Sequence, residues 1–120
     1  MSRYLAAAAI LFGLLTGSAL AHHGWGGYTS ADFTLTGTVV DTHLGNPHDR
    51  LTVDVDGEMW NVVLSPPDRS RRAGFADDIV KVGDVVTMLG NRHANPGTLE
   101  MKTRRITVED HNYDLYPRRL

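Results

Sequence analysis

The 120-residue sequence contains no cysteine. This absence excludes disulfides, iron–sulfur clusters, cysteine zinc sites and the thiolate copper centres of electron-transfer proteins. Exported domains of this size often depend on disulfides, so here the hydrophobic core must hold the fold together by itself.

The sequence also lacks any apolar run of the roughly 20 residues that a transmembrane helix requires. A shorter apolar run at 5–15 follows Arg3 and precedes an Ala-Leu-Ala cleavage pattern that ends at Ala21. These three parts predict a bacterial Sec-type signal peptide over residues 1–21. We therefore expect a periplasmic or secreted protein that makes no stable membrane insertion after cleavage.

An excess of positive charge is likewise missing. The chain has 12 Lys and Arg against 14 Asp and Glu, and loss of Arg3 with the signal would move its net charge from -2 to -3. Proteins that follow a phosphate backbone usually present a basic surface. The charge and the expected location together predict no nucleic-acid partner.

The 99 residues after the predicted cleavage are enough for one small domain. Residues 22–32 form a His- and Gly-rich arm without hydrophobic periodicity, and alternation of apolar and polar residues begins at Phe33. Such alternation is typical of half-buried strands. The predicted strands are 33–41, 51–55, 59–64, 85–89 and 99–108, with a further short edge strand at 113–115.

Turn and helix signals set the order of these strands. Asp56-Gly57 predicts a tight hairpin, and Ser65-Pro66-Pro67-Asp68 ends the sheet. Asp68 is expected to cap a short helix that continues to Arg72. A second helical turn is expected at 76–80. Three strands, a helix and two strands are the order of the OB-fold, so we predict an all-β, five-stranded, partly open barrel over 33–116 with a tail at 117–120. A β-sandwich is the alternative.

Cleavage after Ala21 would place His22 and His23 at a new amino terminus. The amine and the Nδ1 atom of a first-residue histidine can chelate one metal ion, and the amine loses its proton at about pH 7.7. A third nitrogen would complete a histidine brace, a geometry that suits Cu(II). Alternatively, the amine, the His22–His23 amide and the His23 imidazole could bind Cu(II) without help from the fold, or both residues are simply exposed.

Two loop histidines are candidates for the third nitrogen. His48 follows Pro47, which restricts the backbone, and Asn46, which can bond the local backbone. His93 lies in the last loop, nearer to where an OB barrel begins its first strand. The 11-residue arm can span up to about 36 Å, so it reaches either loop. We favour His48, with His93 as the substitute, and expect Trp25 and Tyr28 to shield the metal or stack on a ligand.

Several motifs occur together: His22-His23-Gly24-Trp25, Gly37-Thr38-Val39, Asn46-Pro47-His48, Trp60 with Leu64, Pro66-Pro67, and Lys81-Val82-Gly83-Asp84. In this combination the sequence resembles a family of small exported bacterial proteins of unknown function, marked by His-His after the signal and Asn-Pro-His after strand one. The arm departs from that pattern, with Gly27-Tyr28-Thr29 where an aromatic and an acid are expected. The resemblance implies export and the histidine set, and it implies no activity.

The sequence contains no recognisable catalytic triad, so we expect binding rather than catalysis. The leading hypothesis is a periplasmic metal-binding protein, with copper as the expected metal and zinc as the alternative. A rival is an OB-type module that binds a small ligand or a periplasmic protein partner through the face of its second and third strands, with the histidines incidental. An oxidative copper enzyme ranks third, because no substrate cleft can be identified from the sequence.

Overall fold

The computed structural model describes residues 24–120 and leaves out residues 1–23. The predicted signal peptide and the predicted ligands His22 and His23 therefore lie outside the described residues. Among residues 24–120, no helix is long and apolar enough to cross a bilayer. The strands and helices are β1 (Phe33–His43), β2 (Arg50–Val55), β3 (Glu58–Val63), α2 (Pro67–Arg72), β4 (Val85–Arg92), β5 (Glu100–Val108), β6 (His111–Asp114) and the 3₁₀ turn η1 (Pro117–Arg119).

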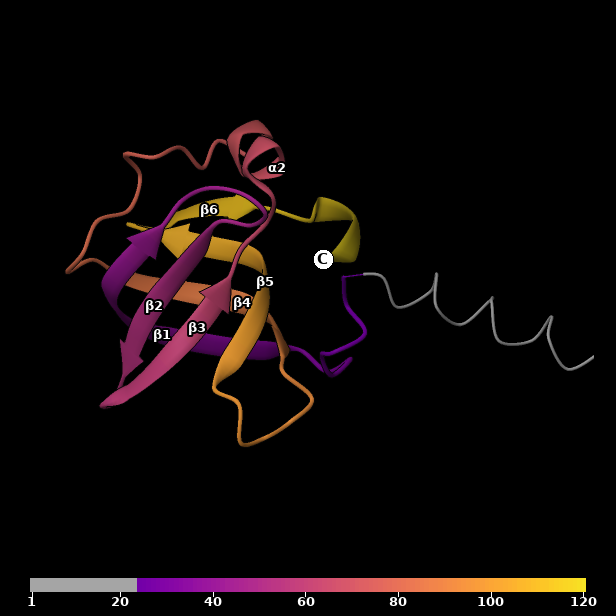
Figure 1. The fold of residues 1–120 in the computed structure, drawn as a ribbon. Coiled ribbons are helices and arrows are strands. Elements are labelled where there is room, and N and C mark those ends of the chain that lie inside the picture. The colour runs from indigo at the N-terminus through magenta and orange to yellow at the C-terminus, as the bar shows by residue number, and fades with distance from the viewer. Residues whose placement is uncertain (1–23) are drawn as a thin grey trace, which may run out of the picture.

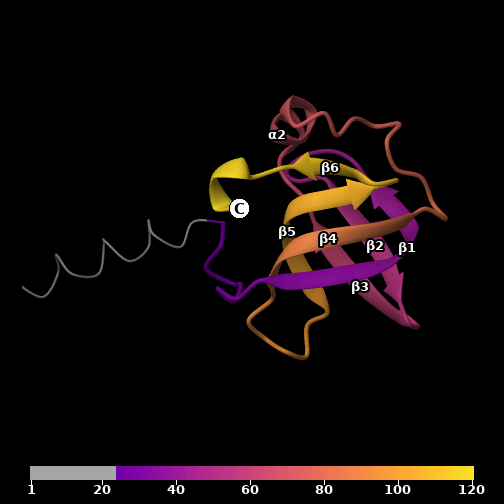
Figure 2. The same ribbon diagram turned by 180° about the vertical axis from the view of Figure 1, so that it is seen from behind.

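The strands form a closed barrel (Figures 1 and 2). The sheet order is β3-β2-β1-β4-β5-β6. A parallel pairing of β3 with β5 closes strands β1 to β5 into the barrel, and β6 lies outside it. The long strand β1 pairs with β4 along its first half and with β2 along its second half, with a register shift between Val39 and Asp41. This bulge bends β1 from one side of the barrel to the other. The predicted OB-like barrel is confirmed.

One hydrophobic core fills the barrel. Inward-facing residues of all five barrel strands are fully or almost fully buried, as are Phe75 and Val80 from the connection between α2 and β4. Trp60 and Met88 belong to this core, as their positions on predicted strands indicate. Burial of this apolar surface explains how the domain folds without disulfides.

Two local predictions need correction. Residues 76–80 form turns rather than helix, because buried Phe75 and Val80 anchor a segment too short for a stable helical turn between them. Helix α2 begins at Pro67 with Pro66 as its N-cap, so the expected Asp68 cap is not formed because Asp68 lies inside the first turn. The residues of the predicted tail include η1, which lies against β5, since the Arg104 guanidinium donates to the Arg119 carbonyl at 2.6 Å. The edge strand is present as β6.

Candidate functional site

The N-terminal arm and η1 lie at the same end of the barrel (Figures 1 and 2), where Trp25 of the arm contacts Tyr116 and Arg119. Lys102 Nζ donates a hydrogen bond to the Gly24 carbonyl and lies 4.6 Å from the centre of the Trp25 ring. The Arg119 guanidinium lies 4.4 Å from the same ring centre, and Tyr116 contacts its edge, with ring centres 5.1 Å apart. We call these five residues the arm site.

Lys102 is the centre of the arm site. It is only 4% exposed, and no carboxylate among residues 24–120 forms an ion pair with it. Burial, and then the positive charge of Arg119, lower the pKa of the Lys102 ammonium. A buried cation held by a carbonyl and aromatic rings costs desolvation energy, which marks this position as a functional candidate.

His48 lies beside the arm site. Lys102 is in register with Val63 of β3, and the next residue, Leu64, donates its N–H to the carbonyl of Asp49 at 2.8 Å. Burial is the largest cause that lowers the pKa of His48, followed by the charges of Lys102 and Arg50, while Asp49 opposes them. His48 is therefore favoured in its neutral form, the form that binds metal ions.

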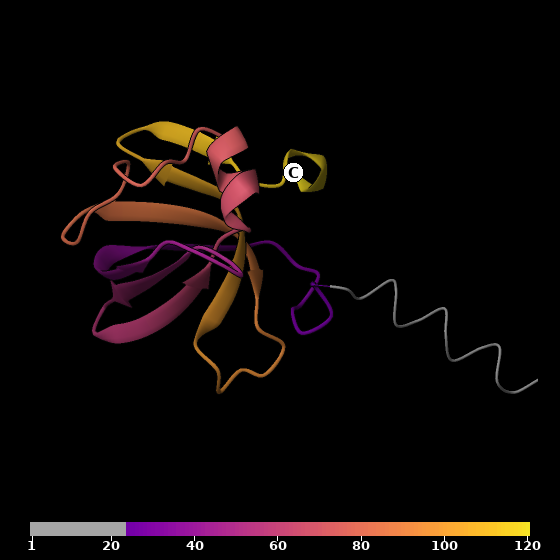
Figure 3. The ribbon, with the colours of Figure 1, turned by 45° about the horizontal axis from the view of Figure 1, so that its top comes forward.

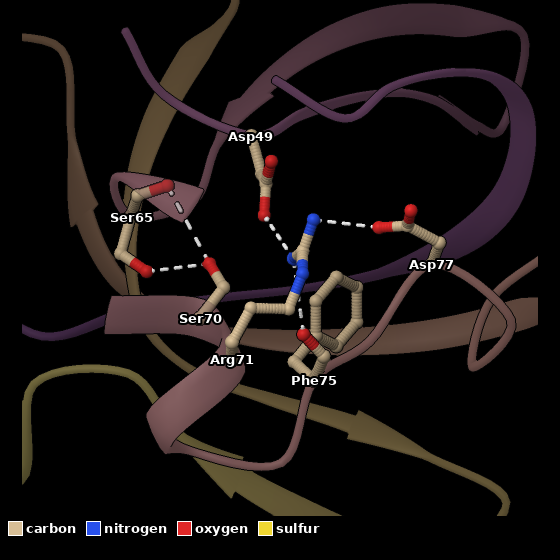
Figure 4. Close-up of polar contacts among 6 residues, drawn as sticks. All are labelled: Asp49, Ser65, Ser70, Arg71, Phe75 and Asp77. Carbon is tan, nitrogen blue, oxygen red and sulfur yellow. Dashed lines mark hydrogen bonds and ion pairs between the residues drawn. The ribbon is translucent and has the colours of Figure 1, made fainter. Parts of the chain in front are cut away.

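A buried polar network anchors the loop that carries His48 (Figure 4). Asp49 is fully buried, and its Oδ2 accepts a hydrogen bond from Arg71 at 3.1 Å. Arg71 also donates to Asp77 at 2.6 Å and to the Phe75 carbonyl at 3.2 Å. This network ties the loop to α2. It holds the backbone next to His48 even though Asn46 is exposed and its side chain makes no hydrogen bond with the described residues.

His93 lies against a later part of the arm. Tyr28 forms an isolated β-bridge with His93, and their ring centres are 5.7 Å apart. The Nδ1 atom of His93 accepts the Asn95 N–H at 3.0 Å, which leaves Nε2 as the atom that could bind a metal. The arm thus passes from Lys102 at Gly24 to His93 of the last loop at Tyr28.

Tyr28 has a polar partner of its own. Its hydroxyl donates to Glu100 Oε2 at 2.7 Å, and Asn61 Nδ2 donates to the other carboxylate oxygen at 2.7 Å. Burial and the Glu100 carboxylate raise the pKa of Tyr28 well above its usual value. Tyr28 therefore stays protonated and fastens the arm to β5.

The described residues alone do not form a metal site. Within residues 24–120, no group of three or more His, Asp or Glu side chains is placed to hold a metal ion. Sequence reasoning missed Lys102, Tyr116 and Arg119, which build the arm site with Trp25. The available signal was the pair of cations at Lys102 and Arg104 in an otherwise buried strand, because buried cations need covering partners.

A titration tests the electrostatic link between Lys102 and His48. The Lys102 ammonium is one cause of the lowered pKa of His48. Lys102→Met should therefore raise the pKa of His48, which is measured by NMR from the ring protons of His48. Lys81→Met is the matched control, since it removes an exposed lysine elsewhere. In the wild type, the unfolded state binds a proton at His48 at a higher pH than the folded state does. Protonation of His48 should therefore lower the free energy of unfolding as the pH falls below about 6.5. An unchanged His48 titration in Lys102→Met would refute the link.

Comparison with solved structures finds the same fold in several proteins. A chain of the Stn1–Ten1 complex of S. pombe shares 20% identity with a TM-score of 0.52, over 67% of this chain and 59% of that one. Rim1, a mitochondrial single-stranded DNA-binding protein of S. cerevisiae, shares 13% identity with a TM-score of 0.52, over 66% and 92%. TiaS in complex with agmatine shares 13% identity with a TM-score of 0.52, over 70% and 26%. A comparison with curated proteins gives no significant match.

The expectation that nucleic acid is excluded was wrong. Rim1 has this fold and is a single-stranded DNA-binding protein, so neither the fold nor a total charge close to zero excludes that class of partner. Net charge is summed over the whole chain, whereas recognition depends on local charge. In this structure Lys102, Arg104 and Arg119 gather at one end of the barrel despite the acidic total.

A protein-family model provides the last comparison. The model of one protein family matches residues 11–100, which include the histidine pair, the Asn-Pro-His loop and the first four barrel strands. The expected family is confirmed: the chain belongs to the family of unknown function DUF6152.

Proposed function

We propose that this protein binds a metal ion, with copper favoured over zinc, and that it does so without catalysis. The ligands are the amine and imidazole of His22, with His23 and His48, and His93 is the substitute for His48. Its role would be storage, delivery or tolerance of the metal in the periplasm. The proposal requires cleavage after Ala21, because only cleavage frees the amine.

One observation carries the proposal: Lys102 contacts the backbone of Gly24 and also lies in register with Val63, whose neighbour Leu64 bonds the backbone of Asp49 next to His48. Gly24 follows His22 by two residues, a separation that extended chain covers in about 7 Å. The contact therefore supports a position for the new amino terminus near His48. It favours His48 over His93, which lies against Tyr28 farther along the arm.

The chemistry of the neighbouring groups supports the same choice. A metal ligand must be deprotonated, and the environment of His48 already favours its neutral imidazole. The nearby Lys102 ammonium repels a cation, so the bonds from the nitrogen ligands to the metal must outweigh this repulsion. Three nitrogen ligands in a T-shaped arrangement suit Cu(II), which has the highest affinity in the divalent series.

A calorimetric titration with Cu(II) tests the proposal. Protein that begins at His22 is compared with protein carrying one additional alanine before His22. Loss of the amine as a ligand should weaken binding at least about tenfold. His48→Ala should weaken binding similarly, whereas His43→Ala, an exposed histidine at the end of β1, should leave it unchanged.

The outcomes distinguish the ligands. Equal affinity with and without the additional alanine would refute the brace. If His93→Ala weakens binding and His48→Ala does not, the third ligand is wrong while the amine remains. A first residue other than His22 in the secreted protein, measured by mass spectrometry, would overturn the whole proposal.

The rival function, binding of a small ligand or a protein partner, is favoured by two surface clefts on either side of η1. A cleft of about 430 Å³ is lined by residues of the arm and of β4 and β5, and one of about 440 Å³ lies next to α2. Both volumes fall within the usual range of ligand sites. Neither cleft uses His48 or His93, so this function does not depend on the histidines.

A further inference from the structure

We propose that the cleft between α2 and η1 binds the phosphate groups of a small anionic ligand. The cleft has a volume of about 440 Å³, and three of the seven residues that line it are arginines: Arg69, Arg72 and Arg118. α2 and η1 face each other across it at one end of the barrel (Figure 3). This site is separate from the proposed metal ligands.

Helix geometry separates the arginines of α2 by role. Arg69 and Arg72 are three residues apart, so they lie on the same face of the helix and both line the cleft. Arg71 lies on a different face and is occupied by Asp49, Asp77 and the Phe75 carbonyl. A simple charged surface therefore does not describe this helix, because one arginine anchors the fold and two remain for a ligand.

Within the described part of the chain, the three arginines of the cleft have no carboxylate partner. No carboxylate among residues 24–120 forms an ion pair with Arg69, Arg72 or Arg118. The single acidic residue in the lining is Asp114, and Arg105 already donates to both of its oxygens, at 2.5 and 3.3 Å. An anion would relieve the repulsion among the three guanidinium groups.

Arg69 is also oriented before any ligand arrives. Its guanidinium lies 4.7 Å from the centre of the Tyr116 ring, which restricts the side chain and lowers the entropy cost of binding. The planar guanidinium group donates two parallel hydrogen bonds that match the geometry of a phosphate. The cleft is large enough for a pyrophosphate or a phosphate ester.

The test is a calorimetric titration with pyrophosphate, at low and at moderate salt. Binding to the wild type should weaken at least about tenfold in Arg72→Gln/Arg118→Gln, because two charge-assisted contacts are lost. Lys81→Gln/Arg50→Gln is the matched control, since it removes two exposed positive charges outside the cleft. Melting temperatures of all variants establish that they are folded.

A second arm of the titration uses an eight-nucleotide single-stranded dT oligonucleotide. If the cleft variant loses pyrophosphate binding and the control variant does not, the site is supported. If the oligonucleotide also binds the wild type more tightly than pyrophosphate does, and the cleft variant loses that binding too, the phosphates come from a nucleic-acid backbone. Equal loss in both double variants would refute the proposal, because net charge alone would then explain binding. No binding of either probe to the wild type would refute it as well. Neither outcome depends on copper, so this proposal and the metal proposal fail independently.

Discussion

Gly90→Ala is expected to lower the free energy of unfolding by about 3 kcal/mol or more. Gly90 lies at the register shift between β4 and β5, where the strands approach so closely that an added Cβ would be 2.0 Å from the Lys102 carbonyl oxygen. Such a contact requires the backbone of one strand to move. Because β4 and β5 are both barrel strands, a shift there disturbs the closed sheet and not only a loop.

Urea denaturation checks this expectation, with Gly45→Ala as the control. A Cβ at Gly45 would meet nothing within 4 Å, so that variant should stay within about 0.5 kcal/mol of the wild type. The clash at Gly90 also displaces the backbone of Lys102, whose side chain donates a hydrogen bond to the Gly24 carbonyl. A folded Gly90→Ala variant should therefore also bind Cu(II) less tightly. Wild-type stability in Gly90→Ala would mean that the two strands are farther apart than the structure indicates.

Arg71→Met is expected to cost about 2–3 kcal/mol, the second large effect. Among residues 24–120, Arg71 is the only residue that donates to the carboxylate of Asp49. That carboxylate is fully buried, and its Oδ1 atom has no partner within the same described residues. The cost falls below that of a completely buried pair because the Arg71 side chain is 37% exposed. Removal of one partner is costly because the other charge stays buried.

Two further variants make the Arg71 prediction specific. Arg72→Met is the matched control on the same helix and should change stability by less than about 0.5 kcal/mol. Asp49→Asn/Arg71→Met should recover part of the loss, since the buried group is then uncharged. If the double variant is as unstable as the sum of both single variants, Asp49 and Arg71 do not act as a pair.

The same network bears on the candidate metal site. Asp49 follows His48 directly, so loosening its anchor should weaken Cu(II) binding through His48 without changing any ligand. Arg71 is therefore a positioning residue for His48 in this proposal. A fall in copper affinity for Arg71→Met, but not for Arg72→Met, would distinguish this effect from a general effect of charge.

Much of the fold was predictable from local sequence. Alternating residues identify β2 and β3, and Asp56-Gly57 defines their hairpin, with Asp56 in a left-handed conformation at φ 52°. The diprolyl segment correctly predicts the end of β3 and the start of α2. These features depend on residues close in sequence, so periodicity and turn chemistry are enough to find them.

The candidate site was only partly predictable. The sequence draws attention to His48, His93, Trp25 and Tyr28 because histidines and aromatic residues in loops are recognisable. It did not indicate that Tyr28 would bridge to His93 or that Trp25 would contact both Lys102 and Arg119. Both arrangements join segments more than 60 residues apart, and no local pattern records such contacts.

The sequence by itself determined the strands, the short helix and the absence of cysteine chemistry, because each follows from residue type and short-range spacing. Only the tertiary structure decided that β3 and β5 close the barrel and that the arm and η1 meet over Lys102. It also decided which arginines of α2 line the cleft and which one anchors the fold. The physical reason is that these contacts depend on how the whole sheet curves and closes, which no single segment encodes.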